Sequence, residues 1–370
     1  MGRQSSSAAR RVVVVVCAAM VVAAAAAQKY NAVYNFGDSI TDTGNLCTNG
    51  RPSQITFTQP PYGETYFGSP TCRCCDGRVV VDFLGNFDSF FDSFVFLVCL
   101  LRRADGGGWW LLQRSTSADF KKGANMAITG ATAMDANFFR SLGLSDKIWN
   151  NGPISFQIQW FQQISSSVCG QNCKSYLANS LFVFGEFGGN DYNAMLFGGY
   201  SADQASTYTS QIVDTISNGV EKLIAMGAVD VVVPGVLPIG CFPIYLTIYG
   251  TSSSSDYDSL GCLKKFNDLS TNHNNQLKTK ISALQSKYKS ARIMYADFYS
   301  GVYDMTCCGS GGGKFNYNNN ARCGMSGASA CSNPASHLSW DGIHLTEAAY
   351  KQITDGWLNG PYCSPAILHS

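Results

Sequence analysis

The sequence predicts an α/β fold with a parallel sheet that helices cover on both faces. Short apolar runs of strand length alternate with longer segments of helical period, and the first three runs end at glycine-containing turns. The 370 residues are 45% hydrophobic and 14% charged, which supplies enough apolar material for a large core. A net charge of +1 without a basic stripe argues against a nucleic acid partner.

Each element is predicted from its own pattern. Four apolar runs are expected to form strands, at residues 32–36, 181–184, 229–233 and 293–296. Two segments, 206–226 and another from about residue 263, repeat apolar residues at spacings of three and four, which is typical of helices. Thr346 is a suitable N-cap for a last helix.

The N-terminus has the pattern of a secretory signal peptide. Three arginines precede sixteen uncharged residues, 12–27, which end in alanines. We expect cleavage near Ala27, a single domain over residues 28–370, and an extracellular location. The alternative is a membrane anchor, but the run is short for a span of about 20 residues.

Secretion changes the interpretation of the fifteen cysteines. Setting Cys17 of the signal aside, fourteen would reach an oxidising compartment, where disulfides are favoured over metal binding. Cys169 and Cys173 are close enough in sequence to pair locally. The other pairings stay open from the sequence, and no metal site is expected.

Two polar segments follow predicted strands. The stretch NFGDSITDTGN, from Asn35 to Asn45, places Ser39 just after the first strand, and GEFGGNDY follows the run 181–184. In parallel sheets, binding and catalytic sites form at the carboxyl ends of the strands. Ser39 is therefore a candidate nucleophile rather than an ordinary turn residue.

A serine nucleophile needs a base, and the chain has four histidines. His273 lies on the apolar side of a predicted helix and is interpreted as a core residue, while His369 and His337 lack a partner pattern. His344 follows Asp341 by three residues, so that the carboxylate can accept from Nδ1–H and leave Nε2 for the serine. The alternative is a surface aspartate beside a loop histidine.

A serine nucleophile that attacks an acyl carbon also needs an oxyanion hole. We expect the backbone N–H groups of Ser39 and Gly130 and the side chain of Asn190 to supply it, although asparagines after Gly-Gly are commonly turn residues. The nucleophile elbow G-x-S-x-G does not fit, because Thr41 stands where the second glycine would be.

Taken together, these segments resemble a known family. FGDSITDTGN, GANMAITGATA, GEFGGNDY and WDGIHLTEAAY are similar to the signature blocks of plant GDSL-type esterases and lipases of the SGNH hydrolase superfamily, and the resemblance runs from Tyr30 to about Tyr362. It implies a flavodoxin-like three-layer α/β/α sandwich with a central parallel sheet. It also implies hydrolysis of carboxylic esters through an acyl-enzyme, without a metal or organic cofactor.

The resemblance assigns the site residue by residue. Ser39 would be the nucleophile, His344 the base and Asp341 its orienting carboxylate, with Ser39, Gly130 and Asn190 as the oxyanion hole. Substrates would be esters of acyl lipids, acetylated sugars or small molecules. A monomer without a stable membrane span after signal cleavage is the expected state. The resemblance to plant proteins implies the cell wall or apoplast as its extracellular location.

Two segments depart from the family pattern. Residues 85–118 form a Phe-rich, Gly-rich insert, which we interpret as a gene-model artefact; the alternatives are an apolar flap over the site or a membrane-docking stretch. Met305 and Thr306 lead directly into Cys307, where relatives have a longer segment, and this shortening is expected to displace His344. The alternative function is therefore a catalytically impaired secreted protein of the same fold that binds acylated ligands.

Overall fold

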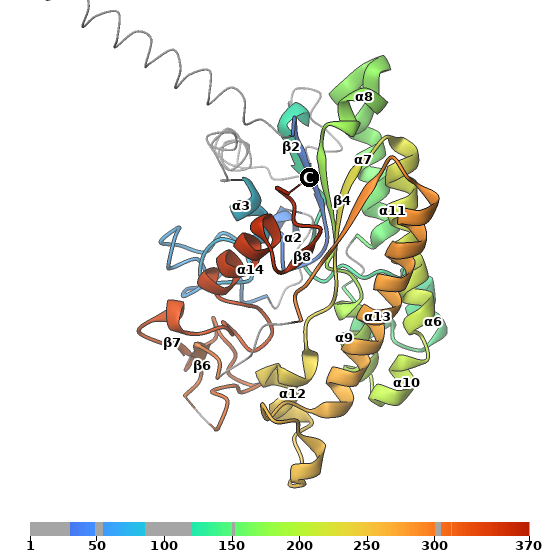
Figure 1. Cartoon of the computed structure of the whole chain (residues 1–370). Coiled ribbons are helices and arrows are strands. Elements are labelled where there is room, and N and C mark those ends of the chain that lie inside the picture. Colours follow the sequence, from blue (N-terminus) through green and yellow to red (C-terminus); the bar gives the residue numbers. More distant parts are fainter. Residues whose placement is uncertain are drawn as a thin grey trace, which may run out of the picture.

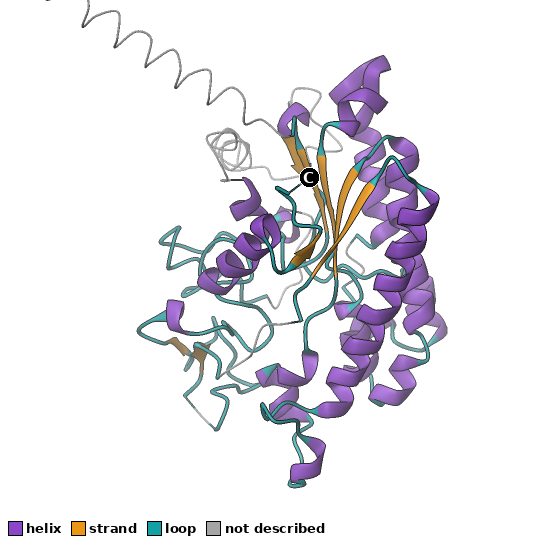
Figure 2. Cartoon of the chain, in the orientation of Figure 1, coloured by secondary structure: helices purple, strands orange, loops and turns teal. Residues whose placement is uncertain are grey.

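The computed structural model describes residues 30–48, 55–85, 120–149, 152–299, 305–311 and 313–369. The predicted signal peptide lies outside these residues, as does the insert beyond Gly85. Figure 1 shows a central sheet between two layers of helices, and Figure 2 separates strands, helices and loops by colour.

The central sheet has six strands in the order β2-β1-β3-β4-β5-β8. Its strands are β1 (Val33–Phe36), β2 (Gly123–Asn125), β3 (Leu181–Phe184), β4 (Asp230–Pro234), β5 (Arg292–Ala296) and β8 (Cys363–Ser364). Strands β1 to β5 are parallel and follow the flavodoxin-like order 2-1-3-4-5. This confirms the predicted fold class, with one correction: β8 pairs antiparallel with the edge strand β5, so the sheet is not wholly parallel.

Helices cover both faces of this sheet. One layer contains α7 (Ile154–Cys169), α11 (Thr209–Met226) and α13 (Lys264–Lys287), and the other contains α3 (Val80–Gly85) and α14 (Glu347–Asn359) (Figure 1). The shorter helices are α2 (Asn45–Thr48), α6 (Ala136–Ser141), α8 (Cys173–Ala178), α9 (Gly189–Phe197), α10 (Ala202–Ser206) and α12 (Pro243–Ile248). A small hairpin of β6 (Cys308–Gly309) and β7 (Ser329–Ala330) lies outside the main sheet.

The predicted elements occur with small shifts. The helix predicted from residue 206 begins at Thr209, because Ser201 and Gln204 form a capping box that starts the separate helix α10. The buried residues of α11 include Ile212, Ile216 and Val220, which confirms the periodicity. Thr346 caps α14 as predicted, since its side chain accepts from the N–H of Ala349.

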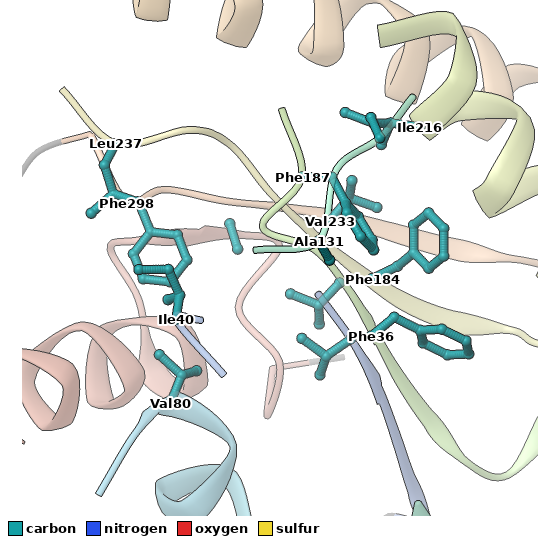
Figure 3. Close-up of a cluster of buried hydrophobic side chains, with 14 of the residues drawn as sticks. Phe36, Ile40, Val80, Ala131, Phe184, Phe187, Ile216, Val233, Leu237 and Phe298 are labelled. Atoms are coloured by element: carbon teal, nitrogen blue, oxygen red, sulfur yellow. The ribbon is translucent and has the colours of Figure 1, made fainter. Parts of the chain in front are cut away.

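The core forms where the strands meet the helices. Phe36, Phe184 and Val233 come from the neighbouring strands β1, β3 and β4 and lie close to Ile216 of α11 (Figure 3). All four side chains are fully or almost fully buried. Burial of aromatic and β-branched side chains in this layer removes a large apolar area from water, and this fixes the ends of the strands from which the polar loops emerge.

Disulfides anchor several loops. The bonds among the described residues are Cys47–Cys72, Cys169–Cys173, Cys241–Cys262, Cys307–Cys331 and Cys308–Cys323. The local pairing of Cys169 with Cys173 is confirmed. Across the described part of the chain, no helix has the length and apolar character needed to cross a bilayer.

Candidate active site

Ser39 lies in a sharp turn at the carboxyl end of β1. The turn begins at Gly37, whose φ is +148° and where a Cβ would lie 2.7 Å from the carbonyl oxygen of Gly185. Gln157 of α7 holds this glycine by accepting from its N–H and donating to its carbonyl oxygen, at 2.9 and 2.8 Å. The close approach explains the glycine, and it places the next residues at the end of the sheet.

Three of the predicted site residues are joined by two hydrogen bonds. Ser39 Oγ is 2.9 Å from His344 Nε2, and His344 Nδ1 is 2.8 Å from Asp341 Oδ2. An ionised carboxylate only accepts, so Nδ1 carries the proton and Nε2 is left to accept from the serine hydroxyl. The short segment before Cys307 was expected to displace His344. The structure differs, because His344 lies within hydrogen-bond distance of Ser39.

Asp341 is buried, and its carboxylate accepts several hydrogen bonds. Its Oδ1 accepts from the N–H groups of Ile343 and His344, at 3.1 and 2.9 Å. The Tyr62 hydroxyl donates to Oδ2 at 2.8 Å. Burial by itself would raise the pKa of Asp341, but the charge of His344 and these hydrogen bonds outweigh it, and the pKa is lowered.

Tyr62 was not identified from the sequence. It lies 279 residues before Asp341, too far for a local motif to connect the two residues. Its side chain is almost completely buried. The hydroxyl is therefore committed to the carboxylate rather than to solvent.

The residues of the predicted oxyanion hole line one pocket. Gly130 has a φ of +83° and lines the same pocket as Ser39 and Asn190. Within the described ranges, no acceptor pairs with the backbone N–H of Ser39 or of Gly130. The Asn190 amide nitrogen instead donates to Asp38 Oδ2 at 2.6 Å and to the Ala131 carbonyl oxygen at 3.0 Å.

Three buried carboxyl groups follow the ends of strands β1 and β3. Burial raises the pKa of Asp38 to about 6, and the N–H of Ile40 and the charge of His344 only partly offset this. Burial and the nearby charge of Asp38 raise the pKa of Glu186 well above its usual range. Burial also raises the pKa of Asp191 to about 7, although the N–H groups of Met134 and Ala133 donate to it.

A pocket of about 560 Å³ opens over Ser39 and His344. Aromatic and aliphatic side chains form much of its wall, among them Phe57, Trp149, Phe197, Ile244, Ile248 and Tyr249. Two cationic residues, Lys147 and Arg322, also line it. A mainly apolar pocket with a few polar groups is the usual form of a small-molecule site.

The other histidines have different surroundings. His273 is fully buried, contacts the Tyr192 hydroxyl through Nδ1 at 2.9 Å, and has its pKa lowered by burial to about 3, consistent with its interpretation as a core residue. His337 lies near Cys307 and Cys331, a grouping with metal-ligand spacing. Because these two sulfurs form a disulfide, they are not available as thiolate ligands.

The arrangement at the end of the sheet defines a class of protein. A serine, a histidine and a buried carboxylate in series, beside backbone N–H groups without acceptors in the described ranges, have the geometry of serine hydrolases. The comparisons with known proteins agree with this class. A family model described as GDSL-like lipase/acylhydrolase matches residues 33–357.

Curated relatives extend over almost the whole chain. A GDSL esterase/lipase of Arabidopsis thaliana is 37% identical over 355 residues, which cover 91% of this chain and 92% of the relative. The sinapine esterase of Brassica napus is 36% identical over 368 residues, which cover 92% of this chain and 88% of the relative. The chain therefore belongs to the GDSL-like lipase/acylhydrolase family, and it is a carboxylic ester hydrolase.

Proposed function

We propose that this protein is a secreted serine esterase that forms an acyl-enzyme on Ser39. The observation that supports this most strongly is the series of contacts from Ser39 Oγ to His344 Nε2 and from His344 Nδ1 to Asp341. Each distance is below 3 Å, which is within hydrogen-bond reach for proton transfer. No metal or organic cofactor is needed for this chemistry.

The reaction proceeds in two halves. Ser39 Oγ attacks the ester carbonyl carbon while its proton passes to His344 Nε2. The tetrahedral intermediate then breaks its bond to the alcohol oxygen, which takes the proton from Nε2. Water, activated by the same nitrogen, attacks the acyl-enzyme and releases the acid. Asp341 holds the ring in the required tautomer throughout.

The oxyanion is stabilised by three donors. The N–H groups of Ser39 and Gly130 supply two of them, and Asn190 supplies the third. The bond from Asn190 to Asp38 is shorter and charge-assisted, whereas the bond to the Ala131 carbonyl is longer and neutral. We therefore expect the N–H that faces Ala131 to turn towards the oxyanion while Asp38 retains the other.

Labelling with a fluorophosphonate probe tests this proposal directly. The probe is expected to modify Ser39, as identified by mass spectrometry of the labelled peptide. Labelling should disappear in Ser39→Ala and fall strongly in His344→Ala, while Ser336→Ala, which removes an exposed hydroxyl, should label normally. Absence of label on well-folded protein would contradict the proposal and favour a ligand-binding role for the same fold.

We also propose that residues 1–27 direct secretion and that residues 28–370 act as one monomeric domain. The five disulfides of the described residues support an oxidising destination. N-terminal sequencing of protein recovered from the medium of a secreting host should begin near Gln28, and its mass by light scattering should be that of one chain. Retention in the cell with an intact N-terminus would contradict the secretion proposal.

A further inference from the structure

Arg322 is a charged residue of the catalytic pocket that the mechanism does not use. Its side chain is exposed and lines the pocket that contains Ser39 and His344. In the part of the chain that the structure describes, no carboxylate forms an ion pair with it. The other cation of the pocket, Lys147, differs because its Nζ is 2.9 Å from Asp146.

A second donor lies beside Arg322 in the same loop. Asn319 also lines the pocket, and its Oδ1 accepts from the Tyr317 hydroxyl at 3.4 Å. Because Oδ1 is engaged in this contact, the amide nitrogen of Asn319 remains as the donor for a ligand. The loop therefore presents a guanidinium and an amide N–H to the pocket, which together suit a carboxylate or another oxyanion.

The loop is attached to the segment that carries the catalytic histidine. The neighbour of Arg322, Cys323, is bonded to Cys308, whose N–H donates to the carbonyl oxygen of Trp340 at 2.7 Å. The Tyr317 ring also packs against Gly342, where a Cβ would lie 2.6 Å from the ring. The backbone next to Arg322 is thus tied to the loop from Trp340 to His344.

This attachment determines which half of the ester Arg322 meets. The leaving alcohol must approach His344 Nε2 to take its proton, so the alcohol half lies over the histidine loop. The acyl half lies at the oxyanion hole, where the Trp149 ring packs against Gly130. Arg322 belongs to the histidine side of the pocket.

We propose that the alcohol half of the natural substrate carries an anionic group, such as a carboxylate, which Arg322 binds with the help of Asn319. This inference rests on the proposed esterase function of the same pocket. It predicts selectivity for charge: with the acyl group unchanged, an anionic alcohol should be preferred to a neutral one of the same size.

The test compares 4-acetoxybenzoate with 4-acetoxybenzamide, which share the acyl group and are nearly equal in size, but carry an anionic carboxylate or a neutral amide on the alcohol part. After correction for spontaneous hydrolysis, kcat/KM should favour the benzoate by about fivefold to twentyfold, the range of a hydrogen bond to a charged group that is partly exposed. Arg322→Gln should abolish this preference, and Arg322→Lys should keep part of it. Arg140→Gln is the matched control: it removes the same charge from an exposed side chain that does not line the pocket, and it should leave the ratio unchanged.

The outcomes separate the two proposals. Equal kcat/KM values for both esters, or a preference that persists in Arg322→Gln, would overturn the role of Arg322 and leave the esterase function standing. Failure to hydrolyse either ester, together with absence of fluorophosphonate label, would overturn the esterase function itself.

Protection from fluorophosphonate labelling tests the same proposal without measuring hydrolysis. 4-Hydroxybenzoate should slow fluorophosphonate labelling of the wild type more than 4-hydroxybenzamide does, and equal protection would contradict the proposal. If Arg322→Gln fails to fold, the salt dependence of the wild type tests the proposal. The preference in kcat/KM for the benzoate ester should weaken in about 0.5 M salt, where screening shortens the range of charge interactions to a few Å. A preference that is insensitive to salt would count against Arg322.

Discussion

The carboxylate of Asp341 is the most highly constrained side chain of the site. It accepts from the Tyr62 hydroxyl, from the His344 ring and from two backbone N–H groups, so both of its oxygens are saturated. A saturated, buried carboxylate remains ionised and has little freedom to rotate. The orientation of the His344 ring therefore depends in part on Tyr62, which lies far from it in sequence.

Removing the hydroxyl of Tyr62 tests this dependence. Tyr62→Phe keeps the ring, but it deletes one hydrogen bond to the charged Asp341, which is worth about 1.5–3 kcal/mol. We expect kcat/KM to fall about tenfold with the fold intact, as measured on a neutral aryl acetate. Tyr66→Phe is the control, since Tyr66 is 48% exposed. Unchanged activity in Tyr62→Phe would mean that Asp341 is held well enough without it.

Asn190, the proposed third oxyanion donor, is hydrogen-bonded to the buried carboxyl group of Asp38. Asn190→Ala removes the proposed third donor, and loss of one such donor costs about 10²–10³ in kcat in other enzymes. We expect a decrease of this size, with fluorophosphonate labelling slowed but still confined to Ser39. Near-full activity of a folded Asn190→Ala protein would remove this residue from the oxyanion hole and leave it as a partner of Asp38 alone.

The last helix, α14, positions the histidine loop from its C-terminal side. It begins at Glu347, three residues after His344, and Arg78 binds the Glu347 carboxylate at 2.7 Å. The Thr346 hydroxyl accepts from the N–H of Ala349 at 3.3 Å and donates to the His337 carbonyl at 2.7 Å. One side chain thus caps the helix and closes the loop that carries Asp341 and His344.

Loss of this cap should reduce stability more than catalysis. Thr346→Ala is expected to lower the free energy of unfolding by about 1–2 kcal/mol, because the helix loses its N-cap and the His337 carbonyl loses a donor. Urea unfolding followed by circular dichroism measures this difference. Thr346→Ser retains the hydroxyl and should recover most of it. A loss shared equally by both variants would indicate that packing of the threonine methyl, rather than capping, is responsible.

Across the molecule, the parallel sheet gathers acidic residues at one buried edge. Asp38 follows β1, while Glu186 and Asp191 follow β3, and all three have raised pKa values because burial penalises their charged forms. Each holds its proton more tightly in the folded protein than in the unfolded chain, where acidic side chains titrate near pH 4. Between about pH 4 and about pH 6 to 7 the folded protein keeps these protons while the unfolded chain has lost them, so stability falls as the pH rises across this window.

Glu186→Gln isolates this effect, because glutamine has the same shape and cannot ionise. We expect the unfolding temperature of this variant to exceed that of the wild type at pH 8 by a few degrees, and the difference to shrink or reverse at pH 5. Differential scanning calorimetry over this pH range measures it. Asp268→Asn changes an exposed acid and should give no such trend. A constant difference between Glu186→Gln and wild type would show that Glu186 is not protonated on folding.

Local patterns were enough to predict much of this fold and site. The apolar runs of β1, β3, β4 and β5 are buried on both faces of the sheet, so composition alone reveals them. The strands β2 and β8 have three and two residues, without a comparable apolar run, and they form only by pairing with neighbours. Ser39, Asp341 and His344 could be proposed as site residues because each lies in a short motif, and the structure brings the three side chains into contact.

The hydrogen bonds that hold the site residues in place could not be predicted, because they join segments that are distant in the sequence. Tyr62 and Asp341 are 279 residues apart, and Asp38 and Asn190 are 152 residues apart, so their hydrogen bonds exist only after the sheet has brought strand ends and loops together. The place of Arg322 in the pocket likewise depends on the Cys308–Cys323 bond. The sequence specifies which side chains can react, through motifs of a few residues. Packing of distant segments specifies what each side chain contacts, because burial and hydrogen bonding act between neighbours in space.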